Sequence, residues 1–442
     1  MGDTHGAVPS ELLRPPKEGR SPVRVTAAFS RLLRLPGIWV RDVVFGADRV
    51  TVTVALRRRR RLVCPVCGYS TRSRHDTRPV ESIWRHLDLG AWRLEVRARL
   101  RRLDCPTHGV RVEGVPFARA GSRFTRDFED LVGYLATTAD KTTVCRLVRI
   151  DWDTVGRIIT RVMGDALDPD RLEQLFEIGV DEVSWRKRHN YLTLVSNHRT
   201  NQVVWGAEGR GTATLDGFFD ELGPQRSATV AAVSMDMSAG YAKSARKPGH
   251  APTAVICYDP FHVVALATKA LDTVRRQVWN DLRRLDPAAA KRFKGARWVL
   301  LKNPTDLNDD QAATLRKLRR RGGDLWRAYT LKEALRAVFA GDLDEAEVAE
   351  LLDRFCSRAS RSGLKAFVTL ARTIRKHRAG ILAAVRLGVN NARHEALNRR
   401  VRMIVNRAYG FHSARAALAL IMLTVGPITH VLPHERAAVP DG

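Results

Sequence analysis

"FEIGVDEVSW" (176–185) is the stretch of sequence that decides the fold, because an apolar, strand-like run meets two acids there, Asp181 and Glu182. Carboxylates seldom stand at the end of a buried strand without a partner. Asp181 is therefore either an active-site residue or the first residue of a polar turn. The order of the elements that follow decides between these two possibilities.

Strand-like segments continue after this stretch. Two more strands follow across short polar turns, as in an antiparallel meander, and then come buried strands that end in Asp236 and Asp259. Three strands, a helix, and then strand, helix and strand is the order of the RNase H-like fold, in which the first strand lies beside the fourth. The sequence therefore predicts an α/β core with Asp181 and Asp236 at adjacent strand ends. The predicted elements are strands 190–197, 202–210, 228–238 and 253–259, helices 212–222 and 241–245, and a long helix from near Phe261 and His262.

The predicted closeness of Asp181 and Asp236 points to a metal site. Two carboxylates at adjacent strand ends repel each other, so both stay ionised only if a cation lies between them. Mg²⁺ prefers hard oxygen ligands and keeps several waters. Two such ions about 4 Å apart can activate an attacking oxygen and stabilise a leaving one. We therefore expect two Mg²⁺ (or Mn²⁺) ions, and a third carboxylate from a later helix.

Glu395, in "NNARHEALNRRVRMI" (390–404), is the candidate for the third carboxylate. On a helix it shares one face with polar and basic side chains spaced three or four residues apart. An acid that binds metal beside groups that hold phosphate explains this pattern. The alternative is an ordinary exposed helix with an ion pair. The candidate DNA-binding residues of this face are Asn391, Asn398, Arg399 and Arg402.

Two short motifs near the N-terminus predict a metal site of another kind. "CPVCG" (64–68) is followed by "CPTHG" (105–109), with strand-like sequence between them. Each presents two ligands on a tight turn, and three Cys and one His suit tetrahedral Zn²⁺ with no open position. The pattern indicates a structural zinc ribbon, the alternative being two unrelated turns. The predicted ligands are Cys64, Cys67, Cys105 and His108.

The ribbon is followed by a helical region. Within residues 137–165, "KTTVCRLVRI" (141–150) fits a short helix, Asp151 and Trp152 a turn, and Asp153 or Thr154 the cap of a second helix. This outline is typical of a helix-turn-helix that contacts DNA. The alternative is a generic helical linker.

Composition favours a polyanionic partner. The 442 residues carry a formal charge of +28, with a pI of about 10.8, and basic blocks at 57–61 and 317–321. Such an excess is typical of a nucleic-acid-binding protein, the alternative being a protein with a merely basic surface. Four arginines of the ribbon strands favour phosphate contact over a solvated face. These are Arg97, Arg99, Arg101 and Arg102.

Residues 263–388 exceed what a bare RNase H fold needs and are predicted to form a helical insertion. Helical patterns cover 265–285, 315–322 and 364–386, while the strand-like "GARWVLLKNP" (295–304) interrupts them. Trp298 in this stretch is either a buried core residue or an aromatic that stacks on an unpaired base. The sequence favours the buried core residue.

Taken together, these motifs resemble the ISL-three family of insertion-sequence DDE transposases, over about residues 60–415. The motifs that carry the resemblance are "CPVCG…CPTHG", "GVDEVSWRKRHNY", "VSMDMSAGY", "YDPFHVV", "RWVLLKN" and "HEALNRRVRMIVNRAYGFHS". The resemblance implies a zinc ribbon, a helix-turn-helix and an RNase H-like core. It also implies Mg²⁺-dependent cleavage and joining of DNA at the inverted repeats of the element.

Residue roles follow from matching these motifs. The resemblance implies that Asp181, Asp236 and Glu395 are the catalytic acids, and that Asp259 and His262 of "DPFH" support the metal site. An alternative alignment makes Asp259 the second metal ligand. Many relatives have a second CxxC knuckle where this chain has Cys105 and His108, a difference that still leaves four zinc ligands. The predicted divisions are a disordered tail (1–37), strands and zinc ribbon (38–118), helix-turn-helix (120–168), catalytic core (175–262), helical insertion (263–388), closing catalytic helix (389–430) and a second disordered tail (431–442).

The leading functional hypothesis is a transposase that binds double-stranded DNA, both transposon ends and target. Such reactions pair two ends, so we expect a homodimer or a larger synaptic complex. The alternatives are a DNA-binding protein with an inactive core and an RNase H-like nuclease without strand transfer. No apolar run is long enough for a membrane span and the N-terminus does not read as a secretory signal, so we expect a bacterial cytoplasmic protein, nucleoid-associated when it acts.

Overall fold

The computed structural model describes residues 24–186, 190–293, 295–341, 343–388 and 391–436, with the backbone alone at 292 and 391–395. Within these ranges the chain forms two units. The N-terminal unit comprises 24–135, 147–149 and 430–436, and the C-terminal unit comprises 136–146 and 150–429. No helix in the described part of the chain is both long and apolar enough to cross a membrane.

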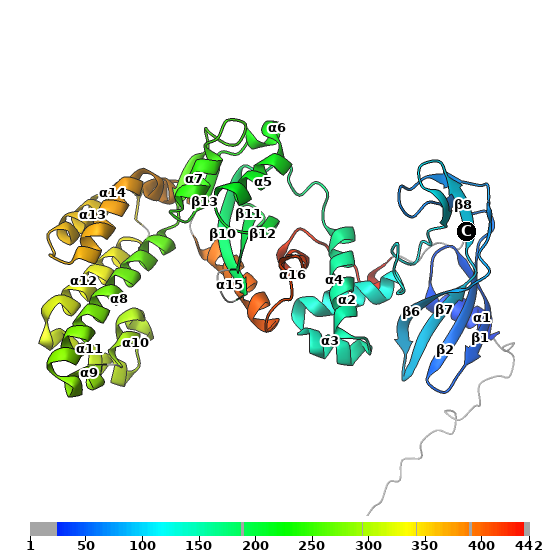
Figure 1. Cartoon of the computed structure of the whole chain (residues 1–442), viewed down its shortest axis with the longest axis horizontal. Helices are drawn as coiled ribbons and strands as arrows, with labels where there is room; N and C mark the ends of the chain where they lie inside the picture. Colours follow the sequence, from blue (N-terminus) through cyan, green and yellow to red (C-terminus); the bar gives the residue numbers. More distant parts are fainter. Residues whose placement is uncertain (1–23, 187–189, 294, 342, 389–390, 437–442) are drawn as a thin grey trace, which may run out of the picture. The chain divides into compact units, whose positions relative to one another are not determined.

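A four-stranded sheet with the order β1-β2-β7-β6 forms the core of the N-terminal unit (Figure 1). Alternate residues of β2, such as Val50 and Val52, are fully buried, as period-two patterning requires. Helix α1 (Val25–Leu33) packs on β1 and buries Phe29 and Leu33. The prediction of a disordered tail over 1–37 is therefore wrong for α1, because these apolar side chains join the core. The strands are β1 (Ile38–Phe45), β2 (Arg49–Leu56), β6 (Ser82–Leu89) and β7 (Trp92–Ala98).

Short strands carry the two Cys-containing turns. Strands β3 and β4 form a two-stranded sheet, and three further strands form a sheet with the order β5-β8-β9. Their shared apolar core is small and consists of Leu62, Leu103, Cys64 and Cys105. The strands are β3 (Leu62–Val63), β4 (Ser70–Thr71), β5 (Asp76–Thr77), β8 (Arg101–Cys105) and β9 (Gly109–Val112).

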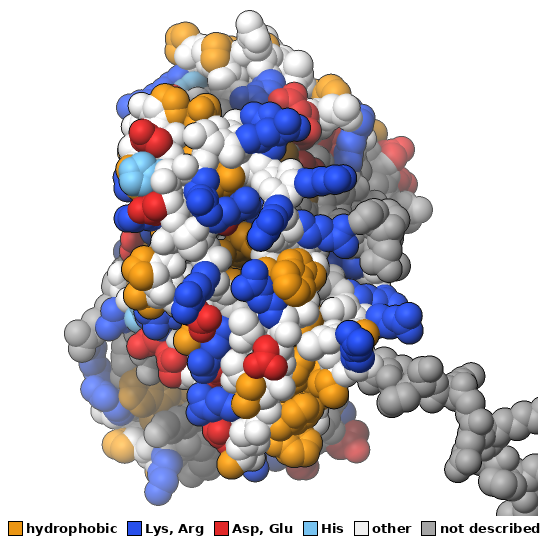
Figure 2. All heavy atoms as spheres, turned by 90° about the vertical axis from the view of Figure 1, so that its right-hand side faces the viewer, with side chains coloured by type: hydrophobic (Ala, Val, Ile, Leu, Met, Phe, Trp, Pro, Cys, Tyr) orange, Lys and Arg blue, Asp and Glu red, His pale blue; other side chains and the backbone are white. Residues whose placement is uncertain are grey.

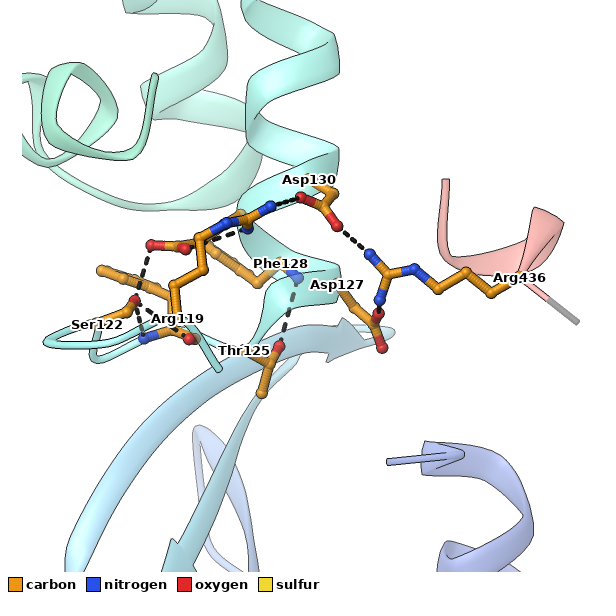
Figure 3. Close-up of polar contacts among 9 residues, drawn as sticks. Arg119, Ser122, Thr125, Asp127, Phe128, Asp130 and Arg436 are labelled. Carbon is orange, nitrogen blue, oxygen red and sulfur yellow. Dashed lines mark hydrogen bonds and ion pairs between the residues drawn. The ribbon is translucent and has the colours of Figure 1, made fainter. Parts of the chain in front are cut away.

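The last described residues pack on the N-terminal unit. Figure 3 shows the guanidinium of Arg436 between Asp127 and Asp130 of helix α2 (Arg126–Thr138), with which it forms ion pairs. Asp130 also accepts a hydrogen bond from Arg119 at 2.6 Å. The prediction of a disordered tail over 431–442 is wrong as far as Arg436, because this paired arginine anchors the segment. Residues 437–442 lie outside the described part.

A five-stranded sheet with the order β12-β11-β10-β13-β14 forms the core of the C-terminal unit (Figure 1). Strands β10, β11 and β12 are antiparallel neighbours, whereas β13 and β14 run parallel to β10. This confirms the predicted RNase H-like order. The strands are β10 (Glu177–Arg186), β11 (Asn190–Asn197), β12 (Gln202–Glu208), β13 (Ala232–Met235) and β14 (Val255–Tyr258).

Helices cover this sheet. Helix α5 packs on β11 and β12, α16 packs on β12, and α14 packs on β14. Helices α3 and α4 precede the sheet in the chain, and α4 packs on α16. The helices outside the insertion are α3 (Lys141–Val148), α4 (Trp152–Ala166), α5 (Thr212–Leu222), α6 (Pro224–Ser227), α7 (Ala239–Ala245), α15 (Asn391–Arg407) and α16 (Ala414–Val425).

The predicted helical insertion consists, in its described residues, of α-helices joined by loops and one 3₁₀ turn (Pro304–Asp306), and its side chains share one hydrophobic core with the sheet. The expected strand over 295–304 is wrong: Ala296, Val299 and Leu300 are buried at helical spacing in α10. The helices are α8 (Pro260–Leu285), α9 (Pro287–Phe293), α10 (Ala296–Leu301), α11 (Asp309–Arg321), α12 (Gly323–Val338), α13 (Glu345–Ser360) and α14 (Lys365–Arg386).

Gly380 permits the close approach of α14 to β14, and we expect its replacement to destabilise the fold. A Cβ at this position would lie 2.4 Å from the ring of Tyr258 and 2.9 Å from the carbonyl oxygen of Ile256. Gly380→Ala should therefore lower the free energy of unfolding by about 2–3 kcal/mol, as overpacking does. Chemical denaturation monitored by circular dichroism measures this change.

Gly164→Ala is the matched control, because this helical glycine of α4 has no atom within 4 Å of its added Cβ. The control should be neutral or more stable by roughly 0.5–1 kcal/mol, since alanine is the better helix former. Equal effects of the two substitutions would contradict the close packing of α14 on the sheet.

The half-buried side chain of His198 should lower the free energy of unfolding at acidic pH. Its Nε2 lies 2.7 Å from the Ser234 hydroxyl, and burial lowers the pKa of His198 to about 4. In the unfolded chain the His198 side chain is protonated below about pH 6.5, whereas in the folded chain it stays neutral down to about pH 4. The free energy of unfolding is therefore highest above pH 6.5 and decreases as the pH falls towards 4. Between pH 7.5 and 5 the contribution of His198 to this loss should be about 2 kcal/mol.

His198→Gln tests this, because it keeps a side-chain amide for Ser234 and removes the titration. Urea unfolding at the two pH values should show a smaller acid loss in this variant than in the wild type, by about 2 kcal/mol. The exposed His434 supplies the control, since His434→Gln should leave the acid loss unchanged. An unaltered loss in His198→Gln would mean that other groups cause it.

Candidate active site and metal centre

The parallel strands bring three aspartates to one edge of the sheet. Gly179 of β10 pairs with Ser234 of β13, so two residues further on Asp181 is level with Asp236. Met235 of β13 pairs with Tyr258 of β14, so the next residues, Asp236 and Asp259, are also level. Because neighbouring strands lie about 4.8 Å apart, the three carboxylates follow one another across adjacent strands.

Asp181 lies in an environment that disfavours its charged form. Burial raises its pKa above the ordinary carboxyl value, and the nearby carboxylate of Asp259 adds to this effect. The backbone N–H of Glu182, 2.8 Å from its Oδ1, and the charges of His262 and Arg402 act in the opposite direction. A buried acid beside a second acid is what a bound cation would stabilise.

Asp259 and His262 lie together at the start of α8. The carboxylate of Asp259 caps this helix by accepting a hydrogen bond from the Phe261 N–H at 2.7 Å, and its other oxygen lies 3.7 Å from His262 Nε2. Asp236 accepts a hydrogen bond from the Ser238 N–H at 3.0 Å. In both aspartates a hydrogen bond from a backbone N–H two residues further on orients one carboxylate oxygen. Both therefore remain candidates for the second metal ligand.

Helix α15 brings basic residues to the same edge. Arg402 is exposed and close enough for its charge to lower the pKa of Asp181, and Asn398 lies one turn before it. Arg399 is also exposed on this helix. The side chains of Asn391 and Glu395 lie outside the described residues, so the predicted third carboxylate stays a prediction. The charges of Asp259, His262 and Arg402 act on Asp181, whereas Asp236 is aligned with Asp181 by strand register alone. Among the described residues, the Cys and His cluster of the N-terminal unit is the one group whose ligand atoms lie close enough to share a metal ion.

The four predicted zinc ligands are brought together in the N-terminal unit. Their ligand atoms all lie within 4.8 Å of one another, with Cys67 Sγ 3.5 Å from Cys105 Sγ and Cys105 Sγ 3.6 Å from His108 Nδ1. Gly68 follows the first pair with φ of 74°, the left-handed conformation that closes such a turn. Four soft ligands at these separations suit a tetrahedral Zn²⁺ with bonds of about 2.0–2.3 Å.

The predicted helix-turn-helix corresponds to α3 and α4. The cap of α4 is neither Asp153 nor Thr154: the carboxylate of Asp151 accepts from the Thr154 N–H at 2.7 Å. Residues 149–151 form the turn, where Arg149 has φ of 56°. Helix α4 buries Val155, Ile158, Ile159 and Val162, which leaves its opposite face for a partner.

Comparison with known proteins agrees with this arrangement. A family model described as "Transposase" matches residues 178–421, one described as "Helix-turn-helix domain of transposase family ISL3" matches 113–163, and one described as "zinc-finger of transposase IS204/IS1001/IS1096/IS1165" matches 60–108. The chain belongs to the ISL3 family of transposases.

Two relatives extend this result along most of the chain. The transposase for insertion sequence element IS1557 of Mycobacterium tuberculosis is 41% identical over 371 residues, which cover 79% of this chain and 83% of the relative. The transposase for insertion sequence element IS1001 of Bordetella parapertussis is 30% identical over 353 residues, which cover 79% of this chain and 85% of the relative. The resemblance to the ISL-three family is thereby confirmed, as are the DNA-binding helix-turn-helix and the structural zinc ribbon.

The ISL3 transposase uses three of the four arginines predicted for phosphate contact within its own fold. Each of the three forms an ion pair with a buried or half-buried acid of the sheets. Because a buried carboxylate is costly without its partner, the acid holds the arginine side chain in place. The pairs are Arg97 with Glu95, Arg101 with Glu113, and Arg102 with Asp76. Arg99 is exposed and lies 3.9 Å from Glu81. Phosphate contact by these arginines stays a prediction, and Arg99 is the most exposed of the four.

Other arginines of the N-terminal unit face outward. Residues 24–135 contain 23 arginines, no lysine and 11 acids, so ion pairs within the unit cannot neutralise it. Figure 2, in which the right-hand side of Figure 1 faces the viewer, shows basic side chains spread over this face, with fewer acidic ones among them. Arg58, Arg59 and Arg72 are exposed and better placed for phosphates than the paired arginines.

Trp298 and Arg407 of the C-terminal unit lie in surroundings that the sequence analysis did not predict. Trp298 is 61% exposed, with the guanidinium of Arg297 5.2 Å from its ring centroid, so the expectation of a buried core tryptophan is wrong. Arg407, at the end of α15, donates hydrogen bonds to the carbonyls of Ala136 and Thr137 at 3.1 and 2.9 Å. This contact ties α15 to the end of α2, and no local sequence signal reveals it.

Proposed function

We propose that this transposase binds the terminal inverted repeats of its insertion sequence and catalyses metal-dependent strand cleavage and transfer. The observation that carries the proposal is the strand register that aligns Asp181, Asp236 and Asp259, with Arg402 near the first of them. A buried acid whose pKa is raised, beside another acid and basic groups, favours a site that handles phosphate charge.

Asp181, Asp236 and Glu395 would hold two Mg²⁺ or Mn²⁺ ions, with Asp259 and His262 in support. Carboxylate oxygens on adjacent strands are the hard ligands that such ions prefer. When bound, the ions supply Lewis acidity at the attacking and leaving oxygens of the phosphodiester. Arg402, Arg399, Asn398 and Asn391 would orient the strand by its phosphates, and Asp259 would hold His262 in place through their 3.7 Å contact.

The division of labour within the chain follows from this proposal. Exposed arginines of the N-terminal unit would neutralise phosphates, while α4 of the helix-turn-helix would read base edges. We retain the division into ribbon (38–118), helix-turn-helix (120–168), core (175–262), insertion (263–388) and closing helix (389–430) as part of the proposal. Joining two ends to a target requires two sites, which favours a dimer or larger synaptic complex.

An assay with labelled duplexes that carry the element's terminal repeats tests the proposal. Cleavage at the repeat ends followed by joining to target DNA, both dependent on Mg²⁺ or Mn²⁺, is the expected result. Cutting without joining would favour a nuclease, and binding alone would favour a DNA-binding protein with an inactive core. A duplex with scrambled ends is the control, and equal cleavage of both duplexes would overturn the assignment to terminal repeats.

A further inference from the structure

A hollow of about 700 Å³ lies beside the catalytic edge of the C-terminal unit. The end of β10 forms one wall, and the end of α15 with the loop after it forms the other. The volume falls within the range of pockets that bind small ligands. Its lining contains no acid. The lining residues are Ser184, Trp185, Arg186, Val405, Asn406 and 409–412.

The hollow continues the elements that carry the catalytic residues. Trp185 lies four residues and about 13 Å beyond Asp181 along β10, where the pairing with β11 shifts register between Ser184 and Arg186. Asn406 lies one turn after Arg402 on α15, about 6 Å along the helix. A DNA strand with one phosphodiester at the aspartates would therefore place a nearby nucleotide at this hollow.

Trp185 supplies an unsatisfied donor. Its side chain is only 5% exposed, and its indole N–H is buried with no acceptor among the described residues. A buried donor without an acceptor costs roughly 1–3 kcal/mol, so a site that keeps one is suited to a ligand that accepts. Base edges and phosphates both present such acceptors.

Tyr409 supplies an aromatic surface. The side chain is 95% exposed, and its backbone is held in the left-handed region with φ of 52° by a hydrogen bond from its N–H to the Asn406 carbonyl. An exposed aromatic ring gains nothing from burial on folding, and a strained backbone at a ligand site is commonly part of the function. Stacking on a base would bury this ring. The exposed Asn406 and His412 add donors on the same wall.

We propose that this hollow holds an unpaired nucleotide of the substrate strand, with its base stacked on Tyr409 and an acceptor on the Trp185 indole N–H. The proposal rests on the proposed function and identifies part of its substrate, a single-stranded flank next to the cleaved phosphodiester. A paired nucleotide could not use these contacts, because its base is stacked within the duplex.

Binding measured without added Mg²⁺ or Mn²⁺, and without a chelator that would remove the ribbon's zinc, tests this separately from catalysis. The probe is a terminal-repeat duplex with a short single-stranded overhang that carries 2-aminopurine, compared with the blunt duplex. Wild-type protein should quench the probe and bind the overhang duplex more tightly. Tyr409→Ala should abolish the quenching and weaken overhang binding by roughly 5- to 150-fold, the range for loss of one base–aromatic stack, with blunt binding unchanged.

Two further variants separate the role of Tyr409 from that of other aromatic residues. Trp185→Phe keeps the ring in the core and removes the N–H, and it should weaken overhang binding less than Tyr409→Ala does. Trp298→Ala removes the exposed aromatic of the insertion and should leave the quenching intact. Quenching that survives Tyr409→Ala, or that is lost in Trp298→Ala instead, would overturn the proposal. Because this binding assay needs no Mg²⁺ or Mn²⁺, a chain that stacks the probe yet does not cleave when these ions are added would contradict the proposed function alone.

Discussion

Asp236→Asn should reduce metal-dependent cleavage of terminal-repeat DNA by roughly 10³-fold or more, with DNA binding unchanged. The carboxylate follows β13 level with Asp181, where an anionic oxygen is needed to hold a divalent cation. An amide removes that charge at almost constant shape, and the several kcal/mol that a metal contributes to the transition state correspond to a loss of this size. Affinity for DNA depends on arginine contacts with phosphates, which the substitution leaves in place. Cleavage rates and gel-shift titrations on the same preparation measure the two quantities.

Asp220→Asn is the matched control, because Asp220 is an exposed acid on α5 of the same unit. It should keep the wild-type cleavage rate. Asp259→Asn distinguishes the two candidates for the second metal ligand: a support residue should cost less than Asp236, and a metal ligand as much. Retained cleavage in Asp236→Asn, together with loss in Asp259→Asn, would transfer the ligand role to Asp259.

Much of the catalytic half could be predicted from sequence because its strands are short apolar runs bounded by turn residues. Strand β11 and helix α5 occupy the predicted ranges 190–197 and 212–222. The placement of Asp181 beside Asp236 needed the RNase H-like order as well, since the two lie far apart in the chain. The zinc ligands needed only local spacing, as each pair shares one turn.

The remaining errors concern contacts that no local pattern encodes. Helix α10 looked like a strand because a short apolar run fits either element, and only packing decides. The same holds for the ion pair that ties Arg436 to α2 and for the acids that pair with Arg101 and Arg102. The exposure of Tyr409 and the unsatisfied indole of Trp185 likewise depend on which elements meet. These are tertiary properties, so sequence could identify the family's motifs but not the hollow beside them.

Cys105→Ser should abolish zinc binding, from about one ion per chain to almost none. Cys105 lies 3.5 Å from Cys67 Sγ and 3.6 Å from His108 Nδ1, so its loss leaves three ligands for a tetrahedral ion. The apolar core of these strands is small, so the metal supplies most of their stability, about 10–16 kcal/mol in isolated zinc modules. Metal analysis gives the zinc content, and hydrogen exchange should show β8 and β9 losing protection while the sheet of β10 to β14 keeps it.

Two control variants, His108→Cys and Cys145→Ser, should both retain zinc. The first converts the second knuckle to CxxC and should retain one zinc per chain, because thiolate is an equally suitable ligand. The second removes a half-buried thiol of α3 that lies outside the cluster, so zinc content and exchange should not change. Full zinc occupancy in Cys105→Ser would exclude this cysteine as a ligand. Loss of zinc in Cys145→Ser would show that the cluster does not account for the bound metal.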